Sequence, residues 1–487
     1  MKKILLLVAL AGCTTVGPDY KRPDMPLPAE YPNASEKESV EIPAGWWALY
    51  RDPLLNELIG SAWDRNADVR FAAARVQEAE ALAREAGALR YPEVLGGYSV
   101  ARNRVSEFTS PPPTTTAGLT RTQNQLLAST SFEVDFWGKF ARADEAARAS
   151  LLSSVLSRDT VLLTLAGATA QAYFALRSLD AQIRVLDLVI ESRREALELA
   201  RARANGGLAS ELDVHQAQGV LSDALVQRLE TERNRQLVER LLAQLTGRLD
   251  LKISSGDLFA LPVPPATPPG LPSTLLERRP DVRAAEQTMV SANAQIGVAR
   301  AAQFPTISLT AAVGTQSAEF ADLLRSGAGV WSLGLGVVAP LFDAGRREAR
   351  VDQARARSEQ AVAGYQKSVE TAFREVADAL VNVDRSNGSE AELQLRLQAA
   401  RNALDLSNER YRSGYSPFLE VLDAQRTVND AAIAFVRNRQ ARLAFSVDLM
   451  KALGGGWSDG IQGQSNNSAA PQPAKPPAGI LTLTPNS

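Results

Sequence analysis

The chain has 487 residues but only one cysteine, Cys13, and one histidine, His215. A single cysteine excludes an intrachain disulfide, and a histidine without a second histidine or cysteine nearby argues against a metal site. The formal net charge of −2 gives no indication of a nucleic-acid-binding surface. Because phosphate-binding glycine loops and nucleophile constellations are also missing, we expect neither an enzyme nor a bound cofactor.

Long apolar runs are equally scarce, and we find none of the ~20 residues that a membrane-spanning helix requires. The N-terminus predicts a signal peptide over residues 1–12, with a basic start at Lys2-Lys3 and an apolar region at 4–10. Leu10-Ala11-Gly12-Cys13 resembles the lipobox of bacterial lipoproteins, which implies a covalent lipid on the cysteine. Thr14, where an aspartate would favour retention in the inner membrane, favours the outer membrane. The alternative is an ordinary signal peptide that happens to contain a cysteine.

An internal repeat of about 210 residues is the clearest positive feature of the chain. Asp68-Val69-Arg70 recurs as Asp281-Val282-Arg283, at an offset of 213 residues. Further along, the offset becomes 207 residues and pairs Gly138 with Gly345 and Gly207 with Gly414. A unit of this length is too long for a solenoid repeat, so we interpret it as a duplicated half.

The repeat and the proline-rich segments divide the chain into a leader, two similar halves and a tail. Each half is predicted to hold a helix, a β-hairpin (about 94–137 and 306–340) and a long helical hairpin (140–247, and from about 346 to 452). We expect residues 46–91 to be helical and the helix after 346 to be interrupted at Ser386-Asn387-Gly388. The predicted boundaries are a lipidated extended leader at 13–42, a first repeat at 43–250, a linker at 251–272, a second repeat at 273–457 and a disordered tail at 458–487.

The predicted strands alternate between an apolar face and a polar or small face. Residues 126–137 show this best, with Leu126, Ala128, Thr130, Phe132, Val134 and Phe136 on one face. Strands of about 10 residues with aromatic ends are typical of membrane β-barrels, whereas a soluble sheet with one wet face is the alternative. Four strands cannot close a membrane barrel of ~8 or more, so a barrel requires two or three chains.

Several motifs together resemble outer-membrane factor lipoproteins of the TolC superfamily, NodT/OprM type. This resemblance implies an α+β membrane protein: a homotrimer whose 12-stranded β-barrel continues into a long α-helical coiled-coil barrel across the periplasm. It also implies the exit duct of a tripartite efflux pump, with a periplasmic adaptor and an inner-membrane transporter, usually of the resistance-nodulation-division class, as partners. The motifs are Trp46-Trp47, Asp52-Pro53-Leu54-Leu55, residues 278–286, Phe304-Pro305, residues 341–345, residues 421–426 and residues 453–457.

The helix tips furthest from the strands are the expected gate of such a duct. Glu420 and Asp423 are three residues apart and so share one helix face. In a trimer they would form two rings of carboxylates that repel one another, bind cations and respond to pH. The resemblance assigns both to the acidic constriction. The alternatives are a helix N-terminus for Glu420, with Ser416 as its cap, and an ion pair between Asp423 and Arg426.

The two tip turns carry the remaining candidate residues. The resemblance implies closed-state links at Asp213 and Tyr411, although Asp213 also fits a capping box with Ser210. It places the turns and the adaptor contact near 203–212 and 411–419, at Gly206, Gly207, Ser413 and Gly414. Two other functions remain open: a structural coiled-coil lipoprotein without a pore, and the exit duct of a type I protein secretion system.

Overall fold

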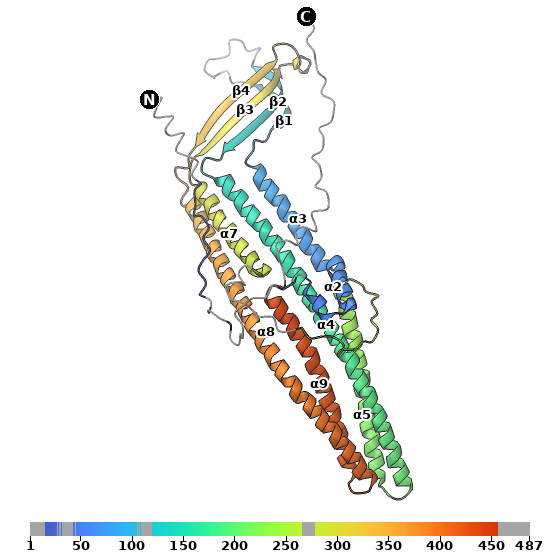
Figure 1. The fold of residues 1–487 in the computed structure, drawn as a ribbon. Coiled ribbons are helices and arrows are strands. Elements are labelled where there is room, and N and C mark those ends of the chain that lie inside the picture. Colours follow the sequence, from blue (N-terminus) through green and yellow to red (C-terminus); the bar gives the residue numbers. More distant parts are fainter. Residues whose placement is uncertain are drawn as a thin grey trace.

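The strands stand at one end of the molecule, and long helices run from them to the opposite end (Figure 1). The computed structural model describes residues 15–26, 28, 31, 42–43, 45–104, 106, 108, 119–264 and 278–455. The predicted signal peptide, the lipidation site Cys13 and the predicted tail at 458–487 lie outside the described residues.

The two halves of the chain share one order of main elements, a helix, two strands and two long helices, and differ in their shorter elements. The first half contains η1 (Trp46–Tyr50), α2 (Pro53–Arg65), α3 (Ala67–Ala88), β1 (Leu95–Arg104), β2 (Thr120–Val134), α4 (Lys139–Asn205) and α5 (Glu211–Leu245). The second half contains α7 (Pro280–Ala301), β3 (Thr306–Ser317), η4 (Phe320–Asp322), β4 (Gly329–Val338), α8 (Arg346–Arg412) and α9 (Phe418–Ala452). The boundaries of α3 and α7 differ by 213 residues, and those of α4 and α8, or α5 and α9, by 207. The change in offset therefore arises within the β-hairpins.

The strands form one antiparallel sheet in the order β1-β2-β3-β4, so the central pair joins the two halves of the chain. In this pair Phe132 lies opposite Leu309 and Thr130 opposite Ala311. Strand β2 begins at Thr120, six residues before the predicted start at 126. Within the described residues β1 and β4 each have one unpaired edge.

One face of the sheet is apolar and uncovered. The strand register places Trp331, Leu333 and Leu335 of β4 on the same face as Val313 and Leu309 of β3. The exposed fractions of Trp331 and Leu333 are 76% and 77%. The opposite face carries small and polar residues such as Gln125, Ser129, Thr310, Ser332 and Gly334. A soluble protein rarely leaves so continuous an apolar face in water.

The helices α4 and α8 contain 67 residues each. At ~1.5 Å per residue each spans ~100 Å. The expected interruption at Ser386-Asn387-Gly388 is wrong, because α8 continues through these residues. Contacts with α9 explain this: Arg442 Nε donates to Asn387 Oδ1 at 2.9 Å, and Asn438 Nδ2 donates to Ser386 O at 3.4 Å. Tertiary contact thus overrides the weak helix propensity of the three residues.

The helical prediction for 46–91 is confirmed up to Ala88, but the structure divides this segment into three elements. Asp52 Oδ1 accepts a hydrogen bond from Leu54 N at 2.8 Å and begins α2, with Pro53 at its first position. Asn66 Oδ1 accepts one from Asp68 N at 2.7 Å and begins α3. These caps allow each helix to start in a new direction.

The prediction that no segment is long and apolar enough to cross a membrane fails for α4. By length and composition α4 qualifies, since an 18-residue window reaches a mean hydropathy of 1.3, with 28% of the window buried. The core helices of soluble proteins pass the same test. Helix α4 contacts α2, α3, α5, α7 and α9, which explains apolar residues on several of its sides.

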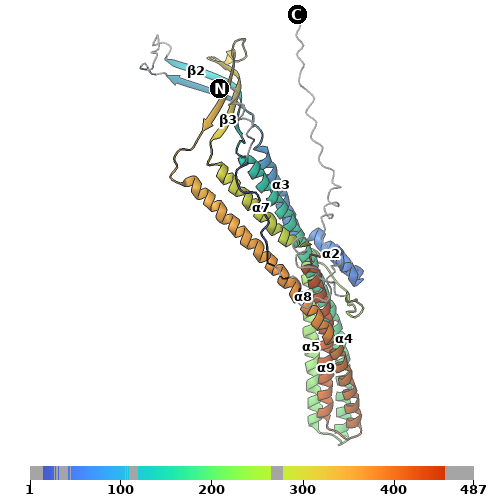
Figure 2. The ribbon, with the colours of Figure 1, turned by 60° about the vertical axis from the view of Figure 1, so that its left-hand side comes forward.

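The largest apolar core lies at the waist of the molecule, where α2 and η1 pack on α4 and α9. Trp46, Tyr50, Leu55 and Phe174 are fully buried there. Among the described helices, only α4, α5, α8 and α9 continue beyond the waist towards the tips, as the rotated view shows (Figure 2). A second apolar cluster, formed by residues of these four helices, lies near the tips.

Candidate functional site

The two helix-hairpin turns lie together at the end of the molecule furthest from the sheet (Figure 1). Both have the same hydrogen bonds. Leu208 N donates to Arg203 O and Tyr415 N donates to Arg410 O, each at 2.8 Å. Together with the bonds from Gly207 N and Gly414 N, these close a Schellman motif at each helix end.

The second glycine of each turn has a left-handed backbone. The φ angles of Gly207 and Gly414 are 72° and 80°, a region that L-residues with a side chain rarely adopt. Gly206 and Ser413, the C-caps of α4 and α8, have ordinary φ angles of −83° and −81°. The glycines at 207 and 414 therefore match the left-handed backbone of the two turns. The backbone conformation of Gly206 does not require a glycine.

Both candidate gate carboxylates have an arginine partner within the same chain. Asp423 Oδ1 accepts from Arg426 Nη2 at 2.8 Å, as the sequence spacing predicts. Glu420 Oε1 lies 3.2 Å from Arg410 Nε, an ion pair between α9 and α8 that the spacing does not predict. The exposed fractions of the Asp423 and Glu420 side chains are 65% and 40%. Asp423 is therefore the more accessible of the two charges.

The capping predictions for the two hairpins differ in outcome. Ser210 is the N-cap of α5, and its Oγ accepts from Leu212 N at 3.1 Å. The expected Ser416 cap of α9 is wrong, because Pro417 holds the N-cap position and makes no side-chain cap bond. Proline has no side-chain acceptor, so it fixes the backbone at the start of α9 without capping the N–H groups of the first turn.

Tyr411 lies in the second apolar cluster near the tips and is only 4% exposed. Its ring packs on Phe418 with centroids 5.1 Å apart. Among the described residues its hydroxyl has no hydrogen-bond partner. Burial raises the pKa of the Tyr411 phenol, and the negative charge of Asp213 raises it further, while Arg203 lowers it. Asp213 and Tyr411 thus interact electrostatically within one chain.

The waist holds a buried charge network that fixes the segment after α5. Asp180, whose side chain is 1% exposed, binds Arg177 and Arg235 at 3.0 and 2.6 Å. Gly256 N also donates to Asp180, and Ile253 N donates to Glu239. These contacts hold residues 251–257 against α4 and α5 and so fix where the helical hairpin leaves the waist.

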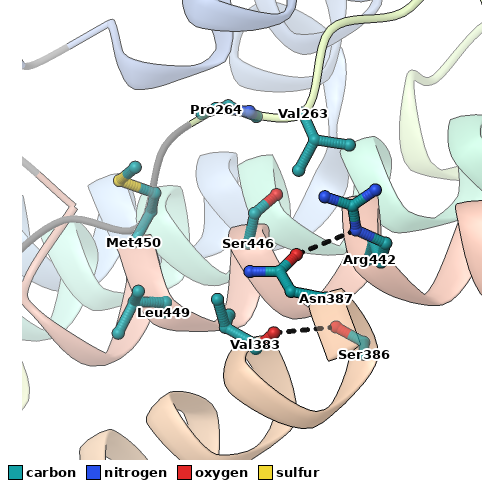
Figure 3. A pocket seen from close by; sticks show the side chains of 9 residues that line it. All are labelled: Val263, Pro264, Val383, Ser386, Asn387, Arg442, Ser446, Leu449 and Met450. Carbon is teal, nitrogen blue, oxygen red and sulfur yellow. Dashed lines mark hydrogen bonds between the residues drawn. The ribbon is translucent and has the colours of Figure 1, made fainter. Parts of the chain in front are cut away.

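A cavity of about 140 Å³ lies between α8 and α9, beside the loop residues Val263 and Pro264 (Figure 3). Val263 and Pro264 cover it, and Ser386 and Asn387 of α8 face Arg442 of α9 across it. Burial lowers the pKa of Arg442. The guanidinium pairs with Glu390, so the cavity is part of the contact that keeps α8 continuous.

The N-terminal leader lies along α7 and begins next to the sheet. Val16 N donates to Trp137 O at 3.0 Å, at the junction between β2 and α4. Arg22 binds Glu286 of α7 with two hydrogen bonds of 2.6 and 2.7 Å. Asp19 binds Arg142 of α4 at 2.6 Å.

Metal-binding chemistry finds no support in the described part of the chain. No group of three or more histidine, cysteine or acidic residues is placed there to hold a metal ion. His215 is exposed on the first half of α5.

The sequence model of the family described as "Outer membrane efflux protein" matches residues 58–248 and 271–455. These two stretches coincide with the two repeats. The chain belongs to this family. The protein is therefore located in the outer membrane of a Gram-negative bacterium, and its helices reach into the periplasm.

Individual relatives extend along nearly the whole chain. The toluene efflux pump outer membrane protein TtgF of Pseudomonas putida is 36% identical, over 95% of this chain and 97% of its own length. The cation efflux system protein CusC of Escherichia coli is 32% identical, over 92% and 97%. The open state of the MtrE outer membrane channel of Neisseria gonorrhoeae superposes with a TM-score of 0.81 at 28% identity, covering 91% of this chain and 98% of that channel.

Proposed function

We propose that three copies of this chain form the outer-membrane exit duct of a tripartite efflux pump. One observation carries the proposal: a four-stranded sheet with an uncovered apolar face and two unpaired edges continues directly into ~100 Å helices. An unpaired strand edge is unstable in lipid, so β4 of one copy pairs with β1 of the next. Twelve strands then close a barrel with the apolar face outward.

The gate of this duct lies at the helix tips, at Asp423 and Glu420. In the trimer their carboxylates form two acidic rings around the narrow end of the helical barrel. Each carboxylate has its own arginine partner, at 2.8 Å for Asp423 and 3.2 Å for Glu420. The rings are therefore partly neutralised, and they narrow the passage without carrying the full charge of six carboxylates. Asp213 and Tyr411 help to hold the closed tip.

The partners follow from this architecture. A lipid on Cys13 anchors the leader at the membrane. The exposed turns at Gly206, Gly207, Ser413 and Gly414 receive a periplasmic adaptor, which links the duct to an inner-membrane transporter of the resistance-nodulation-division class. The cargo is drugs or other small toxic compounds, in keeping with relatives described as toluene and cation efflux proteins. The transporter, and not the duct, selects among them.

Conductance measurements test the duct and its gate together. Purified protein in planar lipid bilayers should form channels of low conductance, and Asp423→Ala should raise that conductance and the uptake of large antibiotics by cells. Asp430→Ala is the matched control, because Asp430 is exposed on the same helix but further from the tip. A purified protein that forms no channel would support a structural coiled-coil lipoprotein. A channel that Asp423→Ala leaves unchanged would refute the gate assignment.

A further inference from the structure

Arg203, in the last turn of α4, reaches from the first hairpin to the second. Its Nη1 donates hydrogen bonds to Tyr411 O at 3.0 Å and Arg412 O at 3.3 Å. Its guanidinium also lies 4.8 Å from the centroid of the Tyr411 ring. These carbonyls end α8, where the helix dipole makes the carbonyl oxygens partly negative, and Tyr411 O accepts from Gly414 N at 3.0 Å as well. One side chain therefore caps α8 and makes a cation–π contact with it.

The contact is made by the face of the Tyr411 ring and not by its hydroxyl. Both Arg203 Nε and Tyr411 Oη are buried and, among the described residues, have no hydrogen-bond partner. Among the described residues the guanidinium is thus held by carbonyls and a ring, and it makes no ion pair with a carboxylate. A shift of α8 relative to α4 would remove these contacts together.

The contacts of Arg203 with Tyr411 are connected to the proposed gate through the second hairpin. Tyr411 packs on Phe418 in the first turn of α9, and Arg410 pairs with Glu420. Residues 410–412 of α8 are thereby tied to the start of α9, where Asp423 also lies. Besides one longer hydrogen bond, from Gln425 Nε2 of α9 to Ser192 Oγ of α4 at 3.4 Å, the described parts of the two hairpins meet near the tips through the apolar contacts of the second cluster. Such contacts allow sliding more easily than directed hydrogen bonds do.

We propose that Arg203 is a positioning residue that latches the closed gate, by holding the end of α8 against the end of α4. The proposal rests on the proposed function of the chain as a gated duct. Opening separates the α8–α9 hairpin from the α4–α5 hairpin and breaks the contacts of Arg203 with Tyr411 and Arg412. Loss of the latch shifts the population towards the open state without any change in the carboxylates.

Single-channel recording of purified protein, without adaptor, tests the latch separately from adaptor docking. We expect Arg203→Gln to raise the open probability about tenfold, equivalent to ~1.4 kcal/mol. Arg201→Gln is the control, because Arg201 lies on the same helix end but pairs with Glu198 at 2.9 Å. Arg203→Lys keeps the charge and should rescue much of the closed state. Equal effects of the Arg203 and Arg201 variants would overturn the proposal.

Variants at Tyr411 test the mechanism of the latch. Tyr411→Leu removes the ring and should open the channel as Arg203→Gln does, and the double variant should open it no further than either single one. Tyr411→Phe keeps the ring and should leave the channel closed. If Tyr411→Phe opens the channel, or if the two single effects multiply, the hydroxyl or some other contact holds the tip and the proposal fails.

Asp423→Ala in the same recordings separates this inference from the proposed function. If Asp423→Ala opens the channel and Arg203→Gln does not, the latch is wrong and the acidic gate stands. If neither variant changes the channel, both the gate and the latch are wrong. Circular dichroism and the heat resistance of the oligomer establish that each variant is folded. If Arg203→Gln does not fold, Arg203→Lys and Tyr411→Leu, compared with Tyr411→Phe, decide the question.

Discussion

Replacing Asp180 with alanine should loosen the waist far more than replacing any exposed carboxylate of α4. Asp180 is almost fully buried and binds Arg177, Arg235 and the backbone amide of Gly256. Its removal leaves two arginines at the waist without their shared anion. Removing one partner of a buried ion pair costs ~3–5 kcal/mol, because the remaining charge stays desolvated.

The loss should appear first as local opening of residues 251–257. An increase of ~3 kcal/mol in the free energy of the closed segment raises the population of its open form about 100-fold. The amide of Ile253 is the best reporter, since its own acceptor, Glu239, is unchanged by the substitution. Hydrogen exchange of peptides covering 251–257, measured by mass spectrometry in detergent, should therefore accelerate by about that factor.

Asp187→Ala is the matched control for Asp180→Ala. Asp187 lies two turns further along α4 and binds Arg228 at 2.5 Å, but its side chain is 51% exposed. An exposed ion pair contributes only ~0–1 kcal/mol, so exchange of residues 251–257 should hardly change. Similar exchange rates in the two variants would show that the waist does not depend on the buried network.

Three further predictions concern the tip, the leader and the core. Gly207→Ala places a side chain at a φ of 72° and should destabilise the tip by ~1–2 kcal/mol, whereas Gly206→Ala, at −83°, should not; thermal unfolding compares the two, and equal shifts would contradict the argument. Glu286→Gln weakens the two bonds to Arg22, so protease cleavage within 15–26 should become several-fold faster, and an unchanged rate would show that the leader is held elsewhere. Burial raises the pKa of Tyr50, so its neutral form stabilises the fold fully below about pH 10, and stability falls by up to ~1.4 kcal/mol per pH unit above that; Tyr50→Phe should flatten this slope in denaturant unfolding.

Strands and turns could be predicted from the sequence wherever they depend on a local pattern of residues. Alternation with a period of two along β3 and β4 predicts strands because each residue's face depends only on its position in the strand. Gly207 and Gly414 predict the tip turns because the backbone there requires a left-handed conformation. The break expected at Ser386-Asn387-Gly388 failed because contacts with Arg442 and Asn438 of α9, which no local pattern reveals, keep α8 helical.

The candidate site was only partly predictable for the same reason. The pair of Asp423 and Arg426 follows from helix spacing, since residues three apart share a face. The contacts of Arg410 with Glu420 and of Arg203 with Tyr411 join separate helices, so no spacing rule identifies them. The sequence nevertheless indicated that these two arginines are related, because the repeat offset of 207 residues aligns Arg203 with Arg410.

This aligned pair shows how the two tips of a duplicated chain can differ in their contacts. Both arginines occupy the last turn of a 67-residue helix, and the backbone around them is the same in both turns. Arg410 pairs with Glu420 in its own hairpin, whereas Arg203 binds the end of α8 in the other hairpin, and the residue aligned with Glu420 is Asp213. The two tips therefore share one backbone geometry but differ in what their aligned arginines contact: one arginine has a partner within its hairpin, and the other joins the two hairpins.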